Sequence, residues 1–465
     1  MVLPHFLYLF QTLPIMITEQ QLHVWQRKCL NFIWNNKKPR VQAKTLYRKT
    51  IDGGIGMPNL PYYYAAAQLS QLLKWGKVGS NSSWIEIEQQ QVSPNVLEAI
   101  LWQTKSQRNP LLYNHLTIGT SLKIWDKWRK YISPGTSPLT WFPQHQLFQG
   151  KLSPGHYSAW IRTGLKRFLD LYQHKKLLSI DKLQQMAGDM KLPWLEYLQI
   201  QEIMRRNDLV KLQVTRSLTE FEIILYNPET MVGGTISKIY NILLREIQET
   251  KTPYMKRWEK LLKLDVAIED WQTIFLNVSN ASLCVNIKEN FFKLLSFWYL
   301  TPSKMRNIYK NDQWLCWKGC SEVGTYFHIW WSCVKMQTFW KMIHVSIQKI
   351  VGCELNFGPL TMLLGYINDG QGIYSHRKLI QNLLAAARLV ITQQWKNPEP
   401  PSEQSWIQKV WDLIIIDNLS QKVRTQQGRQ KENTFLEDWW PIITFLEEKP
   451  LNWKKPDKYK TLFLY

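Results

Sequence analysis

Acidic residues are scarce in this sequence, with 36 Asp and Glu against 58 Lys and Arg. No two aspartates are adjacent, although polymerases and many nucleases use paired carboxylates to hold two metal ions at a phosphate. The motifs G-x-x-x-x-G-K-[S/T], H-E-x-x-H and G-x-S-x-G are also absent. These absences remove the familiar routes to catalysis, so we expect neither an enzyme active site nor a small-molecule substrate.

Cysteine is also rare, with six residues in a chain of 465. That number is too small for a disulfide scaffold in a chain of this length. Three of the six fall within one short window, between residues 316 and 333. This clustering favours a metal site in a reducing compartment.

Long hydrophobic runs are missing as well, and residues 1–18 come closest to one. Pro4 and Pro14 interrupt this stretch, and no basic region precedes it as in a signal peptide. Eighteen residues are also marginal for crossing a bilayer. We interpret the segment as a core helix and expect no membrane partner.

Positive charge and aromatic rings are what the sequence has in abundance. The net charge is +22, and 24 tryptophans and 20 tyrosines are present. Such a charge points to polyanions, nucleic acid first and acidic membranes second. Aromatic rings beside cations suit base stacking, which favours nucleic acid, although most single tryptophans belong to a core.

The first strongly amphipathic helix is predicted over residues 20–35, because its apolar residues share one face: Leu22, Trp25, Cys29, Phe32 and Ile33. A run of cations without acidic residues follows this helix. The run consists of six side chains: Lys37, Lys38, Arg40, Lys44, Arg48 and Lys49. It is either a solvated basic face or a set of phosphate contacts, and the sequence favours neither.

Helical periodicity dominates the chain and strand signals are sparse, so we predict a mainly α, multi-domain protein. Small and polar residues near position 78 mark a first boundary. We predict a helical thumb-like segment at 1–78, a helical connecting domain at 79–265 and a cysteine-bearing domain at 266–465. In the connecting domain, Trp125 and Trp128 belong either to a stacking surface or to the buried face, which we favour.

The spacing C-x3-C-x7-H-x4-C places three cysteines and one histidine in a small zinc-knuckle-like module, residues 314–335: Cys316, Cys320, His328 and Cys333. Three thiolates with one imidazole are a standard ligand set for structural zinc. A segment of this size has almost no core, so the metal would supply its folding energy. Trp317, Lys318 and Trp330 crowd the same window and would stack on unpaired bases and contact phosphate. The alternative is a helix pair in which the thiols and His328 are merely buried.

Short segments spread in one order along the chain carry a family resemblance: Met1-Val2-Leu3-Pro4, Leu7-Tyr8-Leu9-Phe10-Gln11-Thr12-Leu13-Pro14-Ile15, Leu30-Asn31-Phe32-Ile33-Trp34-Asn35, Gly53-Gly54-Ile55, Met57-Pro58, Ile236-Ser237-Lys238-Ile239-Tyr240-Asn241, Tyr299-Leu300-Thr301-Pro302, Lys304-Met305 and the Cys/His window. They resemble the C-terminal part of the second open-reading-frame protein of LINE-type (non-LTR) retrotransposons, a reverse transcriptase and endonuclease polyprotein.

The resemblance implies a thumb remnant, a helical connecting region and a cysteine-bearing domain that bind RNA and RNA/DNA hybrid. It places the endonuclease and the polymerase palm before residue 1, as possible partners of this region. It also implies a ribonucleoprotein in the cytoplasm and nucleus. Two alternatives stay open: a chain that retains polymerase activity, and an inactive relic or gene-model fragment without a function of its own.

Overall fold

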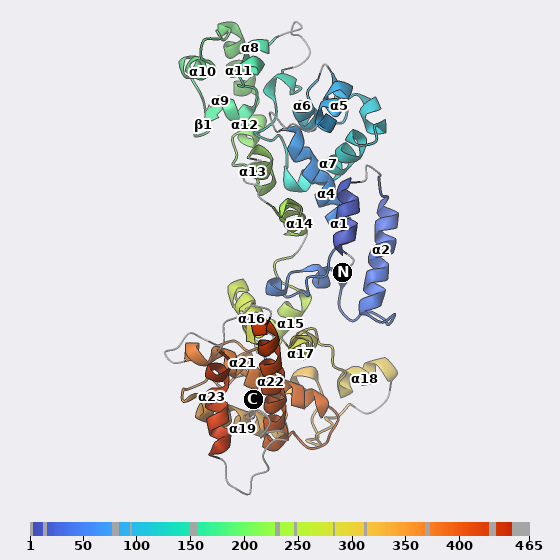
Figure 1. The fold of residues 1–465 in the computed structure, drawn as a ribbon, viewed down its shortest axis with the longest axis vertical. Coiled ribbons are helices and arrows are strands. Elements are labelled where there is room, and N and C mark those ends of the chain that lie inside the picture. The colour runs from blue at the N-terminus through green and yellow to red at the C-terminus, as the bar shows by residue number, and fades with distance from the viewer. Residues whose placement is uncertain are drawn as a thin grey trace. The chain divides into compact units, whose positions relative to one another are not determined.

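The computed structural model of the chain is mainly helical, as the sequence predicts (Figure 1). It describes residues 3–12, 16–76, 83–93, 95–148, 156–227, 233–245, 249–281, 284–310, 314–367, 373–426 and 434–448. Contacts between Cα atoms divide the chain into two compact units. The first contains residues 1–37 and 58–248, and the second contains residues 38–57 and 249–465. The three-domain division expected from the sequence stays a prediction.

The first unit is built from short helices and one two-stranded antiparallel sheet, in which Tyr172 pairs with Leu177. Its elements are α1 (Leu3–Thr12), α2 (Glu19–Ile33), α4 (Leu60–Trp75), α5 (Ser83–Val92), α6 (Leu97–Trp102), α7 (Ile118–Ile132), α8 (Ser158–Arg162), α9 (Phe168–Leu171), β1 (Tyr172–Gln173), β2 (Lys176–Leu177), α10 (Ile180–Ala187), α11 (Trp194–Arg206), α12 (Asp208–Val214), α13 (Glu220–Tyr226) and α14 (Thr235–Arg245).

Helix α4 organises this unit because it is apolar on nearly all sides. Asn59 caps its first turn by accepting a hydrogen bond from the Tyr62 amide. The small side chains of Ala65, Ala66 and Ala67 are buried and allow neighbouring helices to approach closely. Helix α4 contacts α1, α2, α7 and α14. A helix that is hydrophobic all round belongs in the centre of a bundle.

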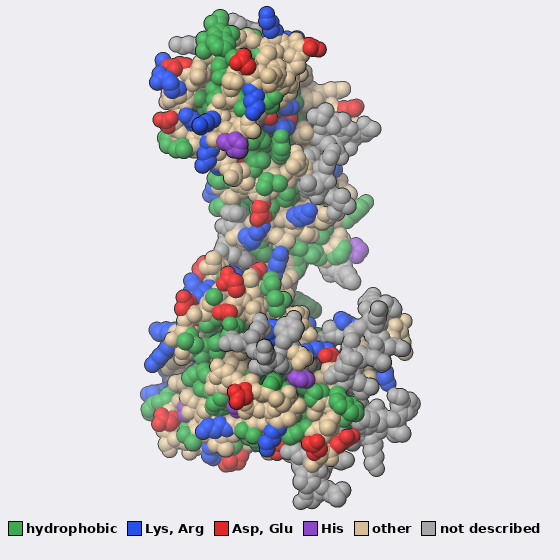
Figure 2. Space-filling view, turned by 90° about the vertical axis from the view of Figure 1, so that its left-hand side faces the viewer, with side chains coloured by type: hydrophobic (Ala, Val, Ile, Leu, Met, Phe, Trp, Pro, Cys, Tyr) green, Lys and Arg blue, Asp and Glu red, His purple; other side chains and the backbone are tan. Residues whose placement is uncertain are grey.

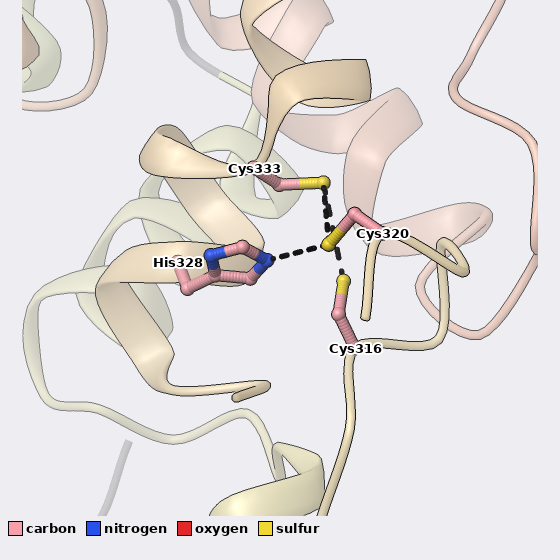
Figure 3. A group of neighbouring side chains, drawn as sticks. All are labelled: Cys316, Cys320, His328 and Cys333. Carbon is pink, nitrogen blue, oxygen red and sulfur yellow. Dashed lines mark hydrogen bonds between the residues drawn. The ribbon is translucent and has the colours of Figure 1, made fainter. Parts of the chain in front are cut away.

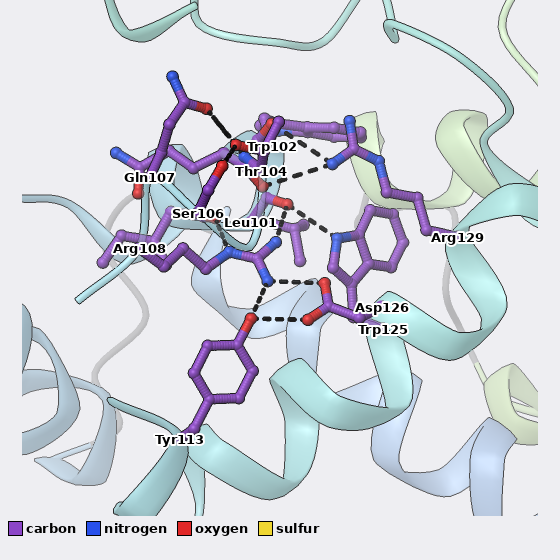
Figure 4. Close-up of polar contacts among 12 residues, drawn as sticks. Leu101, Trp102, Thr104, Ser106, Gln107, Arg108, Tyr113, Trp125, Asp126 and Arg129 are labelled. Carbon is purple, nitrogen blue, oxygen red and sulfur yellow. Dashed lines mark hydrogen bonds and ion pairs between the residues drawn. The ribbon is translucent and has the colours of Figure 1, made fainter. Parts of the chain in front are cut away.

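The tryptophans of α7 belong to the core, which confirms the buried-face interpretation. Trp125 is fully buried and Trp128 nearly so. The Trp125 indole donates to the Leu101 carbonyl, at the end of α6 (Figure 4). The buried Arg108 guanidinium lies beside it, donating to that carbonyl and pairing with Asp126 at 2.6 Å. This polar network accounts for Trp125 and Asp126 of α7, whereas Lys123 and Lys127 on the same helix are exposed.

One face of α2 differs from the sequence-based expectation. Leu22 is buried and Trp25 partly buried, but Phe32 is 87% exposed and Ile33 is also exposed. The predicted apolar face therefore covers the core only along the first part of the helix. Tyr8 and Leu9 of α1 are exposed too, so this end of the unit presents several large apolar side chains.

The second unit contains longer helices around one large core (Figure 1). Its elements are α3 (Ala43–Tyr47), α15 (Pro253–Leu262), α16 (Ile268–Ala281), α17 (Val285–Leu295), α18 (Pro302–Tyr309), the π-helical turn His328–Ser332, α19 (Val334–Val351), α20 (Pro359–Met362), α21 (Ile373–Gln393), α22 (Glu403–Gln426) and α23 (Thr434–Glu447).

The core of this unit combines aliphatic side chains with several large aromatic ones. Trp258, Trp340, Trp406 and Trp411 are all fully buried there, and the predicted Cys/His segment contributes to the same core. Helix α21 runs against α16, α17, α19 and α22. Among the described residues, no helix is both long and apolar enough to cross a membrane.

Candidate metal centre

The four residues predicted from the C-x3-C-x7-H-x4-C spacing lie together in the second unit (Figure 3). The ligand atoms of Cys316, Cys320, His328 and Cys333 all lie within 4.8 Å of one another. The group can therefore hold a metal ion, and the expected Cys/His cluster is present in the C-terminal third of the chain.

The first two cysteines lie on a tight loop. The Cys316 amide donates to the Glu322 carbonyl at 2.8 Å, and Leu315 bridges to Val323, so the loop closes on itself like a small hairpin. Between the cysteines the chain turns at Gly319, whose φ of +69° lies in the left-handed region that glycine adopts without steric cost. This turn brings Cys320 back toward Cys316.

The other two ligands lie at the two ends of a π-helical turn. Thr325 accepts a hydrogen bond from the His328 amide, and the Cys333 amide donates to the His328 carbonyl five residues earlier. The turn leads directly into α19, for which Cys333 is the N-terminal cap residue. The N-terminus of α19 therefore begins directly after this ligand, which fixes the backbone of Cys333 at the start of a long helix.

Three of the distances between ligand atoms are close to those around one tetrahedral ion. Cys316 Sγ lies 3.9 Å from Cys333 Sγ, and Cys333 Sγ lies 3.8 Å from Cys320 Sγ. Two thiolates on a tetrahedral ion with metal–sulfur bonds of about 2.3 Å are separated by about 3.8 Å. Cys320 Sγ lies 3.2 Å from His328 Nε2, slightly closer than the roughly 3.5 Å that the same geometry gives for sulfur and nitrogen. All three cysteines are free thiols rather than disulfides.

Burial makes these groups unfavourable as bare charges. Burial first, and then the neighbouring sulfurs of Cys333 and Cys320, raise the pKa of the Cys316 thiol to about 12. Burial likewise lowers the pKa of His328, so its imidazole is neutral and ready to act as a ligand. A bound metal cation would favour the thiolate over the thiol at each cysteine, because it takes the place of the proton on sulfur.

Lys318 has a structural role that its sequence neighbourhood does not indicate. Its side chain is buried, and Nζ donates to the carbonyl oxygens of Asn397 at 2.6 Å, Glu399 at 3.1 Å and Gln394 at 3.4 Å. Burial lowers the Lys318 pKa, while the nearby thiols of Cys316 and Cys333 counteract that shift. The ammonium therefore ties the metal loop to the linker between α21 and α22.

The two tryptophans predicted to stack on bases, Trp317 and Trp330, are partly and fully buried. Trp317 packs against Trp395 with a ring separation of 6.1 Å. The predicted nucleic-acid contacts of Trp330 and Lys318 are therefore corrected, because both side chains belong to the interior. The expectation that this segment has almost no core is wrong for the same reason.

The cation run divides into exposed and buried members. Lys37, Lys38, Arg40, Lys44 and Lys49 are exposed, as phosphate contacts require. Arg48 is only 7% exposed, and its guanidinium donates to the carbonyl oxygens of Asp52, Glu249 and Thr250. Arg48 thus holds its segment against residues 249–250, and its predicted contact with nucleic acid is corrected.

Comparison with known protein families finds no family model that matches this chain.

Proposed function

We propose that this chain binds RNA and RNA/DNA hybrid, as the region that follows the polymerase domain in a LINE-type reverse transcriptase. The observation that carries this proposal is the set of exposed cations without carboxylate partners among the described residues. Lys38, Arg40 and Lys49 belong to it, whereas Lys44 lies 3.5 Å from Glu249. On the face shown in Figure 2, Lys and Arg side chains are scattered over the surface rather than gathered into one stripe. Discrete phosphate contacts fit that distribution.

We further propose that the metal is zinc and that its role is structural. Three thiolates and one imidazole are soft and borderline ligands that suit Zn²⁺, and four protein ligands complete its tetrahedron. Such a closed site leaves no position for a substrate or a reactive water. With thiolates from Cys316, Cys320 and Cys333, the complex carries a net charge of about −1, which the Lys318 ammonium balances.

Zinc content tests the metal assignment. We expect about one equivalent in the purified protein, and less than half an equivalent after Cys316→Ser or Cys333→Ser, because a thiolate ligand is lost. Cys353→Ser is the matched control, since this thiol lies outside the cluster. Zinc is measured by elemental analysis. Substoichiometric zinc in the unmodified protein, or equal zinc in all variants, would contradict the assignment.

Salt dependence tests the binding function. Contacts to phosphate release counterions, so affinity for RNA should fall linearly on a log–log scale as salt rises. Fluorescence anisotropy with labelled single-stranded RNA, RNA/DNA hybrid and duplex DNA measures this slope and the preference among them. Binding that is absent, or that salt does not weaken, would exclude the proposal.

The proposal assigns no polymerase activity to this chain, which in the cell would act within a cytoplasmic and nuclear ribonucleoprotein. A primer-extension assay with template, primer and nucleotides should therefore give no product.

The second candidate, a relic without a function, is favoured by the exposed apolar side chains of α1 and α2, including Tyr8, Leu9 and Phe32. In a longer polyprotein, the upstream polymerase domains would cover such a surface; alone, it should cause aggregation on expression.

A further inference from the structure

One turn of the second unit gathers three cations from distant parts of the sequence, next to Lys293 of α17, which lies 5.6 Å from the Trp298 ring centroid and pairs with Glu289. The turn follows α17 and contains Phe297 and Trp298. Arg40 donates to the Trp298 carbonyl at 3.0 Å and lies 4.7 Å from the centroid of the Trp298 ring. Lys304 donates to the Phe297 carbonyl at 3.2 Å. The carbonyl groups of two consecutive residues thus position Arg40 and Lys304, which are 264 residues apart in the sequence.

Arg257 of α15 completes the group by stacking on the Phe297 ring, with its guanidinium carbon 3.9 Å from the ring centroid. Phe297 itself is 5% exposed and adopts a φ of +55°, so the ring is a fixed support. Stacking occupies the face of a guanidinium and leaves the N–H groups at its edge available. Arg257 and Arg40 therefore keep donors that no intramolecular contact uses up.

The three cations are exposed, and none forms an ion pair with a carboxylate among the described residues. Partial burial, and then the charges of Arg40 and Arg257, lower the pKa of Lys304, in keeping with the short distances of all three cations from this turn. Carbonyl groups and rings orient these charges without neutralising them. Holding like charges together costs free energy that an anion would recover.

We propose that Arg40, Arg257 and Lys304 form a phosphate-binding site for the backbone of single-stranded RNA, positioned by the turn at Phe297 and Trp298. The site deepens the proposed function and rests on it. Guanidinium donors in a fixed orientation suit the two free oxygens of a phosphodiester, and Lys304 adds a third charge. The contact reads the backbone rather than the bases, so it carries no sequence preference.

The test uses the full-length, zinc-loaded protein and a labelled oligouridine of about 20 nucleotides, titrated by anisotropy at several salt concentrations. The variant R40Q/R257Q/K304Q removes the site. Because the three cations bind one phosphodiester, their loss should weaken binding roughly 10-fold near physiological salt and lower the log–log slope by about 0.7. The charge-preserving variant R40K/R257K/K304R should keep the slope of the unmodified protein.

The matched control is K256Q/K378Q/K409Q, which removes the same charge from lysines that are paired with Glu249, Asp438 and Asp412. It should change affinity by no more than about threefold. Equal loss in both glutamine triples would overturn the site and leave the proposed function standing. Equal loss in the charge-preserving triple, with unchanged zinc content and melting temperature, would also overturn it.

Two further outcomes separate the site from the function. If the unmodified protein does not bind oligouridine, the proposed function fails, and the site fails with it. A second titration with phosphatidylserine-containing vesicles asks whether the phosphate belongs to a lipid. Vesicle binding that requires Arg40, Arg257 and Lys304, combined with RNA binding that does not, would overturn the assignment to RNA.

Discussion

At the scale of single residues, burial separates two kinds of cation that look alike in the sequence. Lys318 and Arg48 both donate to three backbone carbonyl groups and lie in the interior. Lys38 and Lys49 are exposed. A cation that satisfies three carbonyl groups stabilises the fold, whereas an exposed one remains free to meet a ligand.

Removing the Lys318 charge should weaken the metal centre. Lys318→Met leaves three carbonyl groups without their donor and the metal complex without its counter-charge, so we expect a loss of about 2 kcal/mol or more in unfolding free energy. The zinc affinity should fall as well. Chemical denaturation and competition with a zinc chelator measure the two effects.

The control for this change is Lys396→Met, because Lys396 is exposed and lies only loosely over the Trp317 ring, at 5.9 Å. We expect that variant to stay within about 0.5 kcal/mol of the unmodified protein. Equal behaviour of the two variants would show that Lys318 does not support the centre.

At the scale of elements, the helices follow local sequence signals closely. Thr252 and Pro253 begin α15 as cap and first residue, and the Thr252 side chain accepts a hydrogen bond from the Met255 amide. The spacing of Cys316, Cys320, His328 and Cys333 also identified the cluster correctly. These features depend on residues that are near one another in the chain.

Contacts between distant elements could not be predicted in the same way. The carbonyl partners of Lys318 lie 76 to 81 residues further along the chain, and two of the three carbonyl partners of Arg48, on Glu249 and Thr250, lie 201 and 202 residues away. Helical periodicity indicates which face is apolar but not which element covers it. For the same reason the sequence does not indicate that Trp330 is buried, or that Arg40 lies at the same turn as Arg257 and Lys304.

The close packing of Gly324, in the metal loop, against Pro302 of α18 can be tested by replacing this glycine with alanine, which adds one methyl group. A Cβ at Gly324 would lie 2.5 Å from Pro302 Cγ and 2.9 Å from two other ring carbons. Because the Pro302 ring is stiff, Gly324→Ala should cost about 1–3 kcal/mol in unfolding free energy through overpacking. Thermal or urea denaturation of the zinc-loaded protein measures it.

Gly358→Ala serves as the comparison, since a Cβ there has no neighbour within 4 Å and the backbone is extended, with φ of −164°. We expect a change within about 0.5 kcal/mol. A similar cost at both positions would mean that Pro302 yields easily to the added methyl group.

At the scale of the whole molecule, the two units differ in their dependence on metal. The Cys/His cluster belongs to the second unit, and its ligands join the core of that unit. Metal binding adds free energy only to the folded form of the unit that holds the ion. The first unit has its own core around α4 and needs none of this contribution.

Chelation should therefore affect the second unit alone. After zinc removal we expect faster amide hydrogen exchange in α19 and in the loop from 314 to 327, because that region loses its link to the ion. Exchange in α4 and α7 should not change. Mass-spectrometric hydrogen exchange with and without chelator measures both, and faster exchange in α4 would contradict this independence.

Because His328 and Cys333 lie at the two ends of the π-helical turn, the number of residues between them determines whether both can reach the metal. Five residues of ordinary α-helix rotate by about 500°, which would leave His328 and Cys333 facing directions about 140° apart. The wider turn corrects this misalignment by accommodating one additional residue between its hydrogen-bonded groups. Deleting a single residue between positions 328 and 333 would thus swing one ligand out of reach while leaving every metal-binding side chain in the sequence. The four-residue interval is as much a determinant of this centre as the cysteines and the histidine themselves.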